Sequence, residues 1–335
     1  MNGKMILGLS LVLLVFFTAC SKKQQEKPEN DFRVRPLDGG KSLEIAGYAG
    51  KTQVVNIPST LYGIPVTAIG KTAFQKKEII KVTIPKSVTA IGDRAFAENL
   101  LTSVTIGRGV KTIGSEAFID NLLTSVTIRK GVTTIGEGAF QDNLIAAIVI
   151  PNGVTGIGAG AFFNNKISSV TIPDSVTDIG AEAFAGNPLT ELSLSQGNTA
   201  FTARGSCLLS KDGTQVILYF GAEKNAVIPD GVTVIGPGAF SGNQLTGVTI
   251  PNSVTAIEYR AFRQNQLTGI TIPDSVTTIG DLAFTGNQIT SITIGSDVNI
   301  GKSSLDDSGY FNYTYANYGR RGGTYIMHNG YWSRQ

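Results

Sequence analysis

The sequence predicts a repeat solenoid, mostly β, of about nine to ten coils of 22 residues each. An Ala-Phe pair recurs in phase, an isoleucine lies five positions before each phenylalanine, and glycine follows that isoleucine in every repeat but one. A unit this short cannot bury its own apolar side, so neighbouring units must stack to form a core. The phenylalanines are Phe74, Phe96, Phe118, Phe140, Phe162, Phe184, Phe240, Phe262 and Phe284.

Each unit has the side-chain pattern of one solenoid turn. In residues 123–128 apolar side chains alternate with Thr and Ser, which indicates a short strand with Val126 and Ile128 pointing inward. A Pro-Asp-Ser or Pro-Asn-Ser sequence usually follows and turns the chain. A second apolar stretch, which includes Ile135 and Phe140, then crosses the opposite face and leads to the next strand.

Asparagine occupies the third position after the phenylalanine in every repeat except the first, which has Lys77. An amide at this position can donate to and accept from the backbone of neighbouring coils. We therefore predict a structural ladder, formed by Asn99, Asn121, Asn143, Asn165, Asn187, Asn243, Asn265 and Asn287.

These residues together give the pattern Leu-x-x-Val-x-Ile-Pro-x-x-Val-x-x-Ile-Gly-x-x-Ala-Phe-x-x-Asn, which resembles the BspA-like, or treponemal-type, leucine-rich repeats. The resemblance covers about Ile57 to Gly295, and the family commonly carries Cys where this chain has Asn. It implies a curved leucine-rich-repeat solenoid with parallel strands on the concave face. It also implies a surface protein that binds host matrix or plasma proteins and other cells.

The N-terminal segment predicts export. Lys4 precedes an apolar run from Ile6 to Phe17, which is too short for a typical membrane span and is typical of a secretory signal. The sequence Phe17-Thr18-Ala19-Cys20 resembles a bacterial lipobox, although that motif prefers Leu where Phe17 stands. We expect residues 1–19 to be cleaved as a lipoprotein signal peptide and Cys20 to carry acyl chains that hold the protein on a membrane. The absence of aspartate at Ser21 favours the outer membrane or cell surface.

The remaining segments flank or interrupt the repeats. Residues 20–31 predict a flexible tether, and residues 32–57 a capping hairpin around Asp38-Gly39-Gly40. Repeats occupy residues 58–189 and 228–299. Between them, residues 190–227 predict a hairpin insert whose turn contains Asp212-Gly213. Residues 300–335 lose the repeat and become aromatic, which predicts an irregular C-terminal cap.

The sequence offers little that could form a catalytic, metal or cofactor site. Beyond the signal segment it has one histidine, His328, and one thiol besides Cys20, at Cys207, in different segments. A zinc site needs three or four N or S ligands, so none is predicted. The net charge of +3 comes from scattered Lys and Arg, which makes nucleic acid an improbable partner. We expect a monomer with no cofactor and no enzymatic activity.

Candidate binding residues lie on the outward strand positions and in the cap. Two interpretations remain open for each set: the threonine column either stabilises neighbouring strands or binds a ligand, and the aromatic cluster either covers the last coil or forms a ligand platform. The candidate residues are Lys81, Thr105, Thr127, Arg129, Thr171, Glu191, Thr249, Thr271, Tyr315, Tyr318 and Trp332.

The function predicted from these features is a non-enzymatic, adhesin-like binding scaffold on the cell surface that recognises protein partners, including host matrix or plasma proteins. An alternative is a lipoprotein that faces the envelope and organises its components without a host ligand. A third hypothesis, a hydrolase with a site between the insert and the concave face, has no supporting catalytic motif. Specificity is expected where the repeat is least regular.

Overall fold

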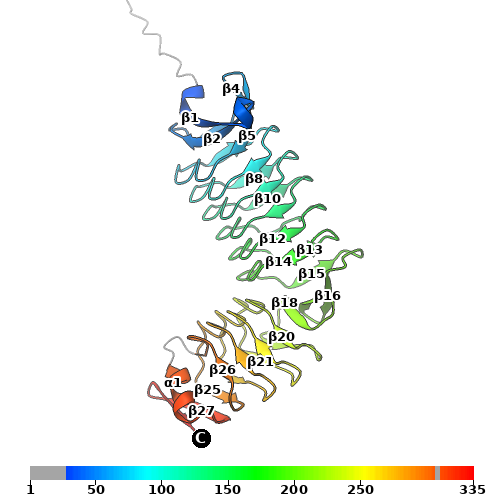
Figure 1. The fold of residues 1–335 in the computed structure, drawn as a ribbon, viewed down its shortest axis with the longest axis vertical. Helices are drawn as coiled ribbons and strands as arrows, with labels where there is room; N and C mark the ends of the chain where they lie inside the picture. The colour runs from blue at the N-terminus through cyan, green and yellow to red at the C-terminus, as the bar shows by residue number, and fades with distance from the viewer. Residues whose placement is uncertain (1–27, 306–309) are drawn as a thin grey trace, which may run out of the picture.

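The structure, a computed structural model, describes residues 28–305 and 310–335. The predicted signal peptide, Cys20 and most of the predicted tether lie outside the described residues. In the described ranges no helix has the length and apolar character needed to cross a membrane. The chain is a mostly-β solenoid of about 12 turns (Figure 1). This exceeds the predicted nine to ten coils because the N-terminal hairpin, the insert and the residues after Ile294 also contribute turns.

Each coil contributes strands to two faces. The strand predicted from the Val-x-Ile pattern forms what we call the long-strand face: β3 (Val54–Asn56), β6 (Lys81–Thr83), β8 (Ser103–Ile106), β10 (Ser125–Ile128), β13 (Ser169–Ile172), β15 (Glu191–Leu194), β19 (Asn225–Val227), β21 (Gly247–Thr249), β23 (Gly269–Thr271) and β25 (Ser291–Ile294). In most of these strands Val and Ile point into the core and the Thr and Ser between them point outward, whereas Val54 of β3 and Val227 of β19 are exposed.

The residues that end in the repeat isoleucine form the opposite, short-strand face. Its strands are β5 (Ile64–Ile69), β7 (Ala90–Ile91), β9 (Thr112–Ile113), β11 (Thr134–Ile135), β12 (Gly156–Ile157), β14 (Asp178–Ile179), β20 (Val234–Ile235), β22 (Ala256–Ile257), β24 (Thr278–Ile279) and β26 (Asn299–Ile300). Neighbouring strands pair in parallel and in register, for example Ile91 with Ile113 and Ile113 with Ile135. The 22-residue repeat therefore places like residues side by side.

The repeat phenylalanines form two stacks of rings along the interior. The first runs from Tyr48 through Phe74 to Phe184, and its consecutive centroids lie 5.0 to 5.5 Å apart. The second runs from Tyr219 to Phe284 with centroids 4.9 to 5.1 Å apart. Each fully buried ring stabilises the fold by roughly 1.5–3 kcal/mol through burial alone, so these columns contribute substantially to the stacking of the coils.

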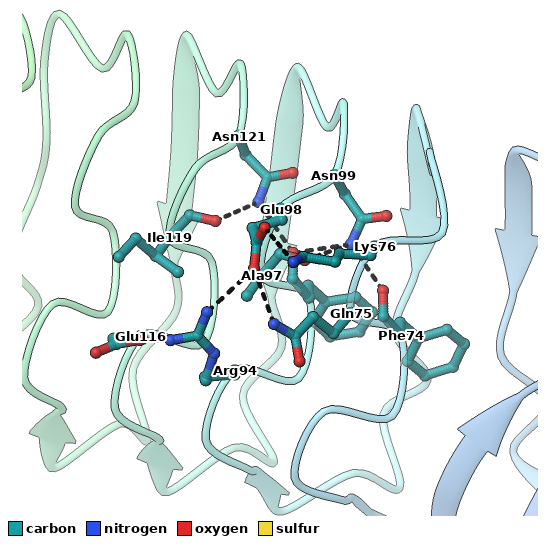
Figure 2. Close-up of polar contacts among 11 residues, drawn as sticks. Phe74, Gln75, Lys76, Arg94, Ala97, Glu98, Asn99, Glu116, Ile119 and Asn121 are labelled. Carbon is teal, nitrogen blue, oxygen red and sulfur yellow. Dashed lines mark hydrogen bonds and ion pairs between the residues drawn. The ribbon is translucent and has the colours of Figure 1, made fainter.

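The predicted asparagine ladder connects the coils beside the rings. The Asn99 amide donates to the carbonyl oxygens of Phe74 at 2.7 Å and Phe96 at 3.0 Å, and its Oδ1 accepts the N–H of Ile79 at 3.0 Å. Asn121 repeats this arrangement one coil further on, and Figure 2 shows its amide also donating to Ile119 O. Each buried amide thus satisfies backbone groups of two coils, which would otherwise be left without partners inside the protein.

A polar cluster lies on the surface next to this ladder. Arg94, Gln75 and Lys76 converge on the carboxylate of Glu98 (Figure 2), and Arg94 also pairs with Glu116. Hydrogen bonds from Lys76 and Gln75 hold the pKa of Glu98 below its ordinary value. The cluster joins three coils, but it is solvent-exposed, so its contribution to stability is small.

Hairpins begin both stacks of rings. At the N terminus, a 3-10 turn, η1 (Pro28–Asp31), leads into β1 (Phe32–Leu37), which pairs antiparallel with β2 (Ser42–Tyr48) across the turn η2 (Asp38–Gly40). A further short strand, β4 (Thr60–Leu61), pairs with β5. The insert has three antiparallel strands rather than two, namely β16 (Phe201–Arg204), β17 (Cys207–Ser210) and β18 (Gln215–Tyr219).

In each of the two hairpins a tyrosine begins the stack of rings, Tyr48 in the first and Tyr219 in the second. Tyr48 O–H interacts with Thr52 Oγ1 at 2.7 Å, and Tyr219 O–H donates to Glu223 O at 3.1 Å. Both hydroxyls therefore close a short loop four residues further along the chain. The insert thus begins the second stack of rings in the same way as the N-terminal hairpin begins the first.

The insert also divides the core. Leu208 and Leu218 pack into the N-terminal hydrophobic cluster, whereas Cys207, Leu209 and Tyr219 pack into the C-terminal one. The alternation along β17 explains this division, because successive side chains of a strand point to opposite sides. We call residues 32–194 the N-terminal half and residues 225–300 the C-terminal half.

The solenoid bends at the insert (Figure 1). At the edge formed by the Ala-Phe turns the halves touch: a Cβ added to Gly242 would lie 2.8 Å from the nitrogen of Gly186. On the long-strand face the insert intervenes, and β15 and β19 belong to separate sheets. The insert therefore separates the two halves on the long-strand face. The Ala-Phe turns, not the long strands, lie on the inner side of the bend.

The C-terminal cap is more regular than its sequence suggests. It consists of helix α1 (Tyr310–Asn317) and an antiparallel hairpin of β27 (Gly323–His328) and β28 (Tyr331–Arg334), and β27 pairs with β25. Phe311 makes edge-to-face contacts with Tyr325 and Trp332 at centroid distances of 5.4 and 5.1 Å. The cap covers the open end of the core and the free edge of the last sheet.

Candidate binding surface

The long-strand face is not a continuous sheet. β3 pairs with β6, β8 with β10, and β13 with β15, but β6 and β8 belong to different sheets. Residues 147–150 form no strand, although their coil stays in the parallel sheet of the opposite face. Shallow grooves follow these interruptions, and each of them lies between neighbouring coils of the N-terminal half.

The largest of these grooves lies between β6 and β8. Val82 and Val104 contribute aliphatic lining, and Thr83, Ser103 and Thr105 contribute hydroxyl groups. Four cationic side chains surround it: Lys81, Lys86, Arg108 and Arg129. We call this feature the cationic groove.

No carboxylate offsets these charges locally. The lining of the cationic groove contains no Asp or Glu. All four cationic residues are exposed, and among the described residues none of them has an ion pair. Like charges held close together by a rigid scaffold raise the local potential and attract anions. The groove is therefore an anion-attracting site on a protein of nearly balanced charge.

Two further grooves continue along the same face. One shares Arg108 and Arg129 with the cationic groove and adds Lys130 and Thr127. The next, between residues 147–150 and β15, is lined by Thr171, Ser193 and Glu191 and contains no cation. The electrostatic character of the face thus changes from positive to neutral or weakly negative towards the insert.

A column of turn residues explains this change. Most coils have an isoleucine at or just after the end of their long strand. The residue two positions after that isoleucine lies in the turn, and it is exposed in each coil of the N-terminal half up to Asp174. It is basic in three successive coils and acidic or neutral afterwards. The column reads Ser59, Lys86, Arg108, Lys130, Asn152 and Asp174 before the insert and Asp230, Asn252, Asp274 and Ser296 after it. We call Lys86, Arg108 and Lys130 the basic column.

The structure brings together some of the predicted binding residues and separates others. Lys81, Thr105 and Arg129 line the cationic groove, and Thr127 lies beside Arg129 in the adjoining one. Thr171 and Glu191 lie in the third groove. Thr249 and Thr271 are exposed on β21 and β23 in the C-terminal half, away from these grooves.

Sequence reasoning missed Lys86, Arg108 and Lys130. They belong to a turn rather than a strand, and only the strand columns were considered as a surface. Aligning the turn at the 22-residue spacing would have revealed the run of three basic residues. What sequence could not reveal is that this run adjoins an interruption in strand pairing.

Two aromatic residues of the predicted surface belong instead to the core of the cap. Tyr315 is 2% exposed and Trp332 is 6% exposed, whereas Tyr318 is 43% exposed. The Tyr315 hydroxyl donates to Gly295 O at 2.8 Å and accepts the N–H of Val298 at 3.1 Å, and burial raises its pKa. Tyr315 and Trp332 therefore pack in the cap over the last coil, which is one of the two interpretations left open for the aromatic cluster, and their burial does not fit the other, a ligand platform.

Cys207 and His328, the two potentially reactive side chains noted in the sequence, lie on different strands of different segments. Cys207 is fully buried, and burial raises the pKa of its thiol to about 12, so it is a poor nucleophile at neutral pH. His328 is exposed on β27 in the C-terminal cap. No group of three or more His, Cys, Asp and Glu side chains in the described ranges is placed to hold a metal ion.

An ionic contact ties the halves together at the inner edge of the bend. Glu182, whose side chain is 13% exposed, lies 3.3 Å from Arg260 and 3.6 Å from Arg263. It also accepts the hydroxyl hydrogen bond of Ser241 at 2.8 Å. Arg260 lies 4.6 Å from the ring centroid of Tyr259. These contacts connect the two halves at the inner edge of the bend.

Sequence and structure comparisons define the class of protein. The BspA type leucine-rich repeat region matches residues 67–191 and 220–317 in six copies. The chain therefore belongs to the BspA-type leucine-rich repeat family. A search of curated proteins gave no match.

Among solved structures, a leucine-rich cell surface protein from Faecalibacterium prausnitzii is 26% identical with a TM-score of 0.58, and the alignment covers 80% of this chain and 88% of that one. The pneumococcal vaccine antigen PcpA is 22% identical with a TM-score of 0.64, covering 83% and 84%. A leucine-rich repeat protein from Eubacterium ventriosum is 24% identical with a TM-score of 0.60, covering 78% and 68%. The last two likenesses show the fold.

Proposed function

We propose that this chain is a non-enzymatic binding protein of the cell surface, which presents the long-strand face of its N-terminal half to extracellular partners. The observation that carries the proposal is the cationic groove, where four exposed cations lack ionic partners within the described residues. Family membership supports a repeat scaffold, and the similar protein from F. prausnitzii is described as a cell surface protein. Solenoids of this type use such extended faces for recognition.

The partners we propose are proteins outside the cell, including host matrix or plasma proteins. The N-terminal signal and the lipobox-like sequence support attachment of the exported chain to a membrane through acylated Cys20, with the outer membrane or cell surface as its destination. Such an anchor holds the protein on a membrane without spanning it. A monomeric rod tethered in this way would project its grooves into the surroundings.

Protease treatment of intact cells tests the location, and a pull-down tests the partner. We expect added protease to remove the repeat region from intact cells and Cys20→Ser to release the protein from the membrane fraction. The purified chain should capture matrix or plasma proteins, with Lys81→Ser reducing capture. Complete protection on intact cells would overturn surface exposure and favour the envelope-facing scaffold.

A further inference from the structure

The cationic groove, proposed above as part of a protein-binding face, also has chemistry that suits a flexible anionic chain. Tight protein interfaces depend on buried aromatic and arginine anchors that fill pockets. Here the lining contains no aromatic residue, and its apolar part is limited to small aliphatic surfaces such as Val82. Its polar part consists of hydroxyls and unpaired cations. Such a lining recognises hydroxyl and anionic groups on a flexible chain.

The spacing of the cations favours a ligand with closely spaced anions. Lys86, Arg108 and Lys130 occupy the same position in three successive coils. Parallel strands lie about 4.8 Å apart, and the ring centroids of Phe96 and Phe118, in the first two of these coils, are 5.2 Å apart. The basic column therefore places about one cation every 5 Å along a straight line.

A peptide strand cannot enter the gap between β6 and β8. Pairing on both sides of an inserted strand would require the two strands to separate to about twice the normal strand spacing. The coils are held at single spacing just before these strands, where Leu100 N–H donates to Ile79 O at 2.9 Å. Any ligand must therefore lie along the outside of the coils, over the basic column.

We propose that the cationic groove and the basic column bind a polyanionic polysaccharide bearing sulfate or carboxylate groups. The anionic groups face Lys86, Arg108 and Lys130, with Lys81 and Arg129 beside them, and sugar hydroxyls face Thr83, Ser103 and Thr105. Arginine contributes a planar pair of donors that matches these oxyanions. This ligand class goes beyond the proposed protein partners and rests on the proposed surface location only for access.

The acidic positions of the same turn column supply a matched control. Asn stands in the column at Asn152 and Asn252, so the fold accepts it there. Lys86→Asn with Arg108→Asn and Lys130→Asn removes three positive charges. Asp174→Asn with Asp230→Asn and Asp274→Asn removes three negative charges from the same column. Circular dichroism and melting temperature establish that both triple variants fold like the parent chain.

The test measures binding of the purified chain to immobilised heparin, with neutral dextran, polyglutamate and duplex DNA as competitors. We expect salt-dependent binding to heparin that dextran does not displace, a loss of about tenfold or more in the basic-column variant, and no loss in the acidic-column variant. Equal losses in both variants, or no loss in the first, would overturn the proposal. So would stronger competition by polyglutamate, which would indicate an acidic protein ligand, or by DNA, which would indicate a nucleic acid. Because cells are not involved, failure here leaves the proposed surface location untouched.

Discussion

The two halves of this solenoid have the same interior and different surfaces. Phe118 and Phe262 stack on their neighbours at 5.2 and 4.9 Å in equivalent rings, and Asn121 and Asn265 make equivalent bonds. The turn column, by contrast, carries three successive cations in the N-terminal half, whereas positions 230, 252 and 274 in the C-terminal half are Asp or Asn. Stability is therefore shared by all coils, whereas the proposed recognition belongs to one part of one face.

The largest expected effect comes from removing a core ring in either half. Phe118→Ala and Phe262→Ala should each cost about 3–5 kcal/mol, because both rings are fully buried in tightly stacked columns. Since the insert divides the core into two clusters, we expect faster hydrogen exchange mainly in the half that carries the substitution. Mass spectrometry of exchanged peptides measures this. Equal acceleration in both halves would show that the insert does not separate them.

The asparagine ladder should be weaker where the insert interrupts it. Asn143 donates to three carbonyl oxygens, including Phe118 O of the preceding coil, and accepts the N–H of Leu123. Among the described residues, the side-chain amide of Asn243 donates only to Ser241 O, while its backbone N–H donates to Asn265 Oδ1. Asn143→Ala should cost about 2–4 kcal/mol, because buried backbone groups lose their partners, and Asn243→Ala less than about 1 kcal/mol. Urea denaturation distinguishes them, and similar costs would contradict this account of the ladder.

The contact between the halves can be tested through Cys207. Burial raises the pKa of this thiol to about 12, so alkylation near neutral pH requires local opening of the junction. Glu182→Gln removes the carboxylate shared by Arg260 and Arg263 and should speed alkylation several-fold. Glu137→Gln, at a residue with no ion pair in the described chain, is the control and should leave the rate unchanged.

The same thiol predicts a loss of stability in alkali. Its pKa is raised on folding from an ordinary value of 9.0, so the unfolded chain releases this proton more readily. The contribution of the neutral thiol to stability is complete below about pH 9 and declines as the pH rises towards 12. Urea midpoints of the parent chain and Cys207→Ala, compared across this range, measure the effect. Parallel curves for the two proteins would contradict it.

The smallest expected effect concerns a surface carboxylate. Burial and the neighbouring charge of Asp142 raise the pKa of Asp120, so its ionised form disfavours the fold. Asp120→Asn, which copies Asn164 two coils further on, should stabilise the protein by less than about 0.5 kcal/mol at neutral pH. The gain should disappear as the pH falls below the ordinary value of 3.8, where the parent residue is also neutral. Thermal melts at both pH values check this.

The interior of the fold could be predicted from sequence because it repeats. Nine phenylalanines in phase indicate coils that stack on one another. The recurring Asn in each repeat predicts a ladder, and its amides make the expected hydrogen bonds to neighbouring coils. The bend could not be predicted in this way. It depends on Leu208 packing into one hydrophobic cluster and Cys207 into the other. The alternation of side chains along a strand allows this division but does not by itself predict it.

The binding surface could be predicted only in part. Strand positions such as Lys81 and Thr105 were identified because their outward orientation follows from the two-residue period of a strand. The role of each aromatic residue in the cap could not be predicted. Tyr315 and Tyr318 are the same residue type in the same segment, but they are 2% and 43% exposed. Burial of this kind depends on tertiary packing of α1 against β27 and β28, which local sequence does not encode.

Transplanting the basic column tests the central claim most directly. Starting from the variant with Lys86→Asn, Arg108→Asn and Lys130→Asn, the changes Asp230→Lys, Asn252→Arg and Asp274→Lys place three cations in the C-terminal half on the same type of coil. The account predicts that heparin binding returns and that hydrogen-exchange protection by heparin moves from residues 81–130 to residues 225–275. Recovery without this movement, or no recovery in a correctly folded chain, would contradict the claim that turn side chains on a shared interior determine recognition.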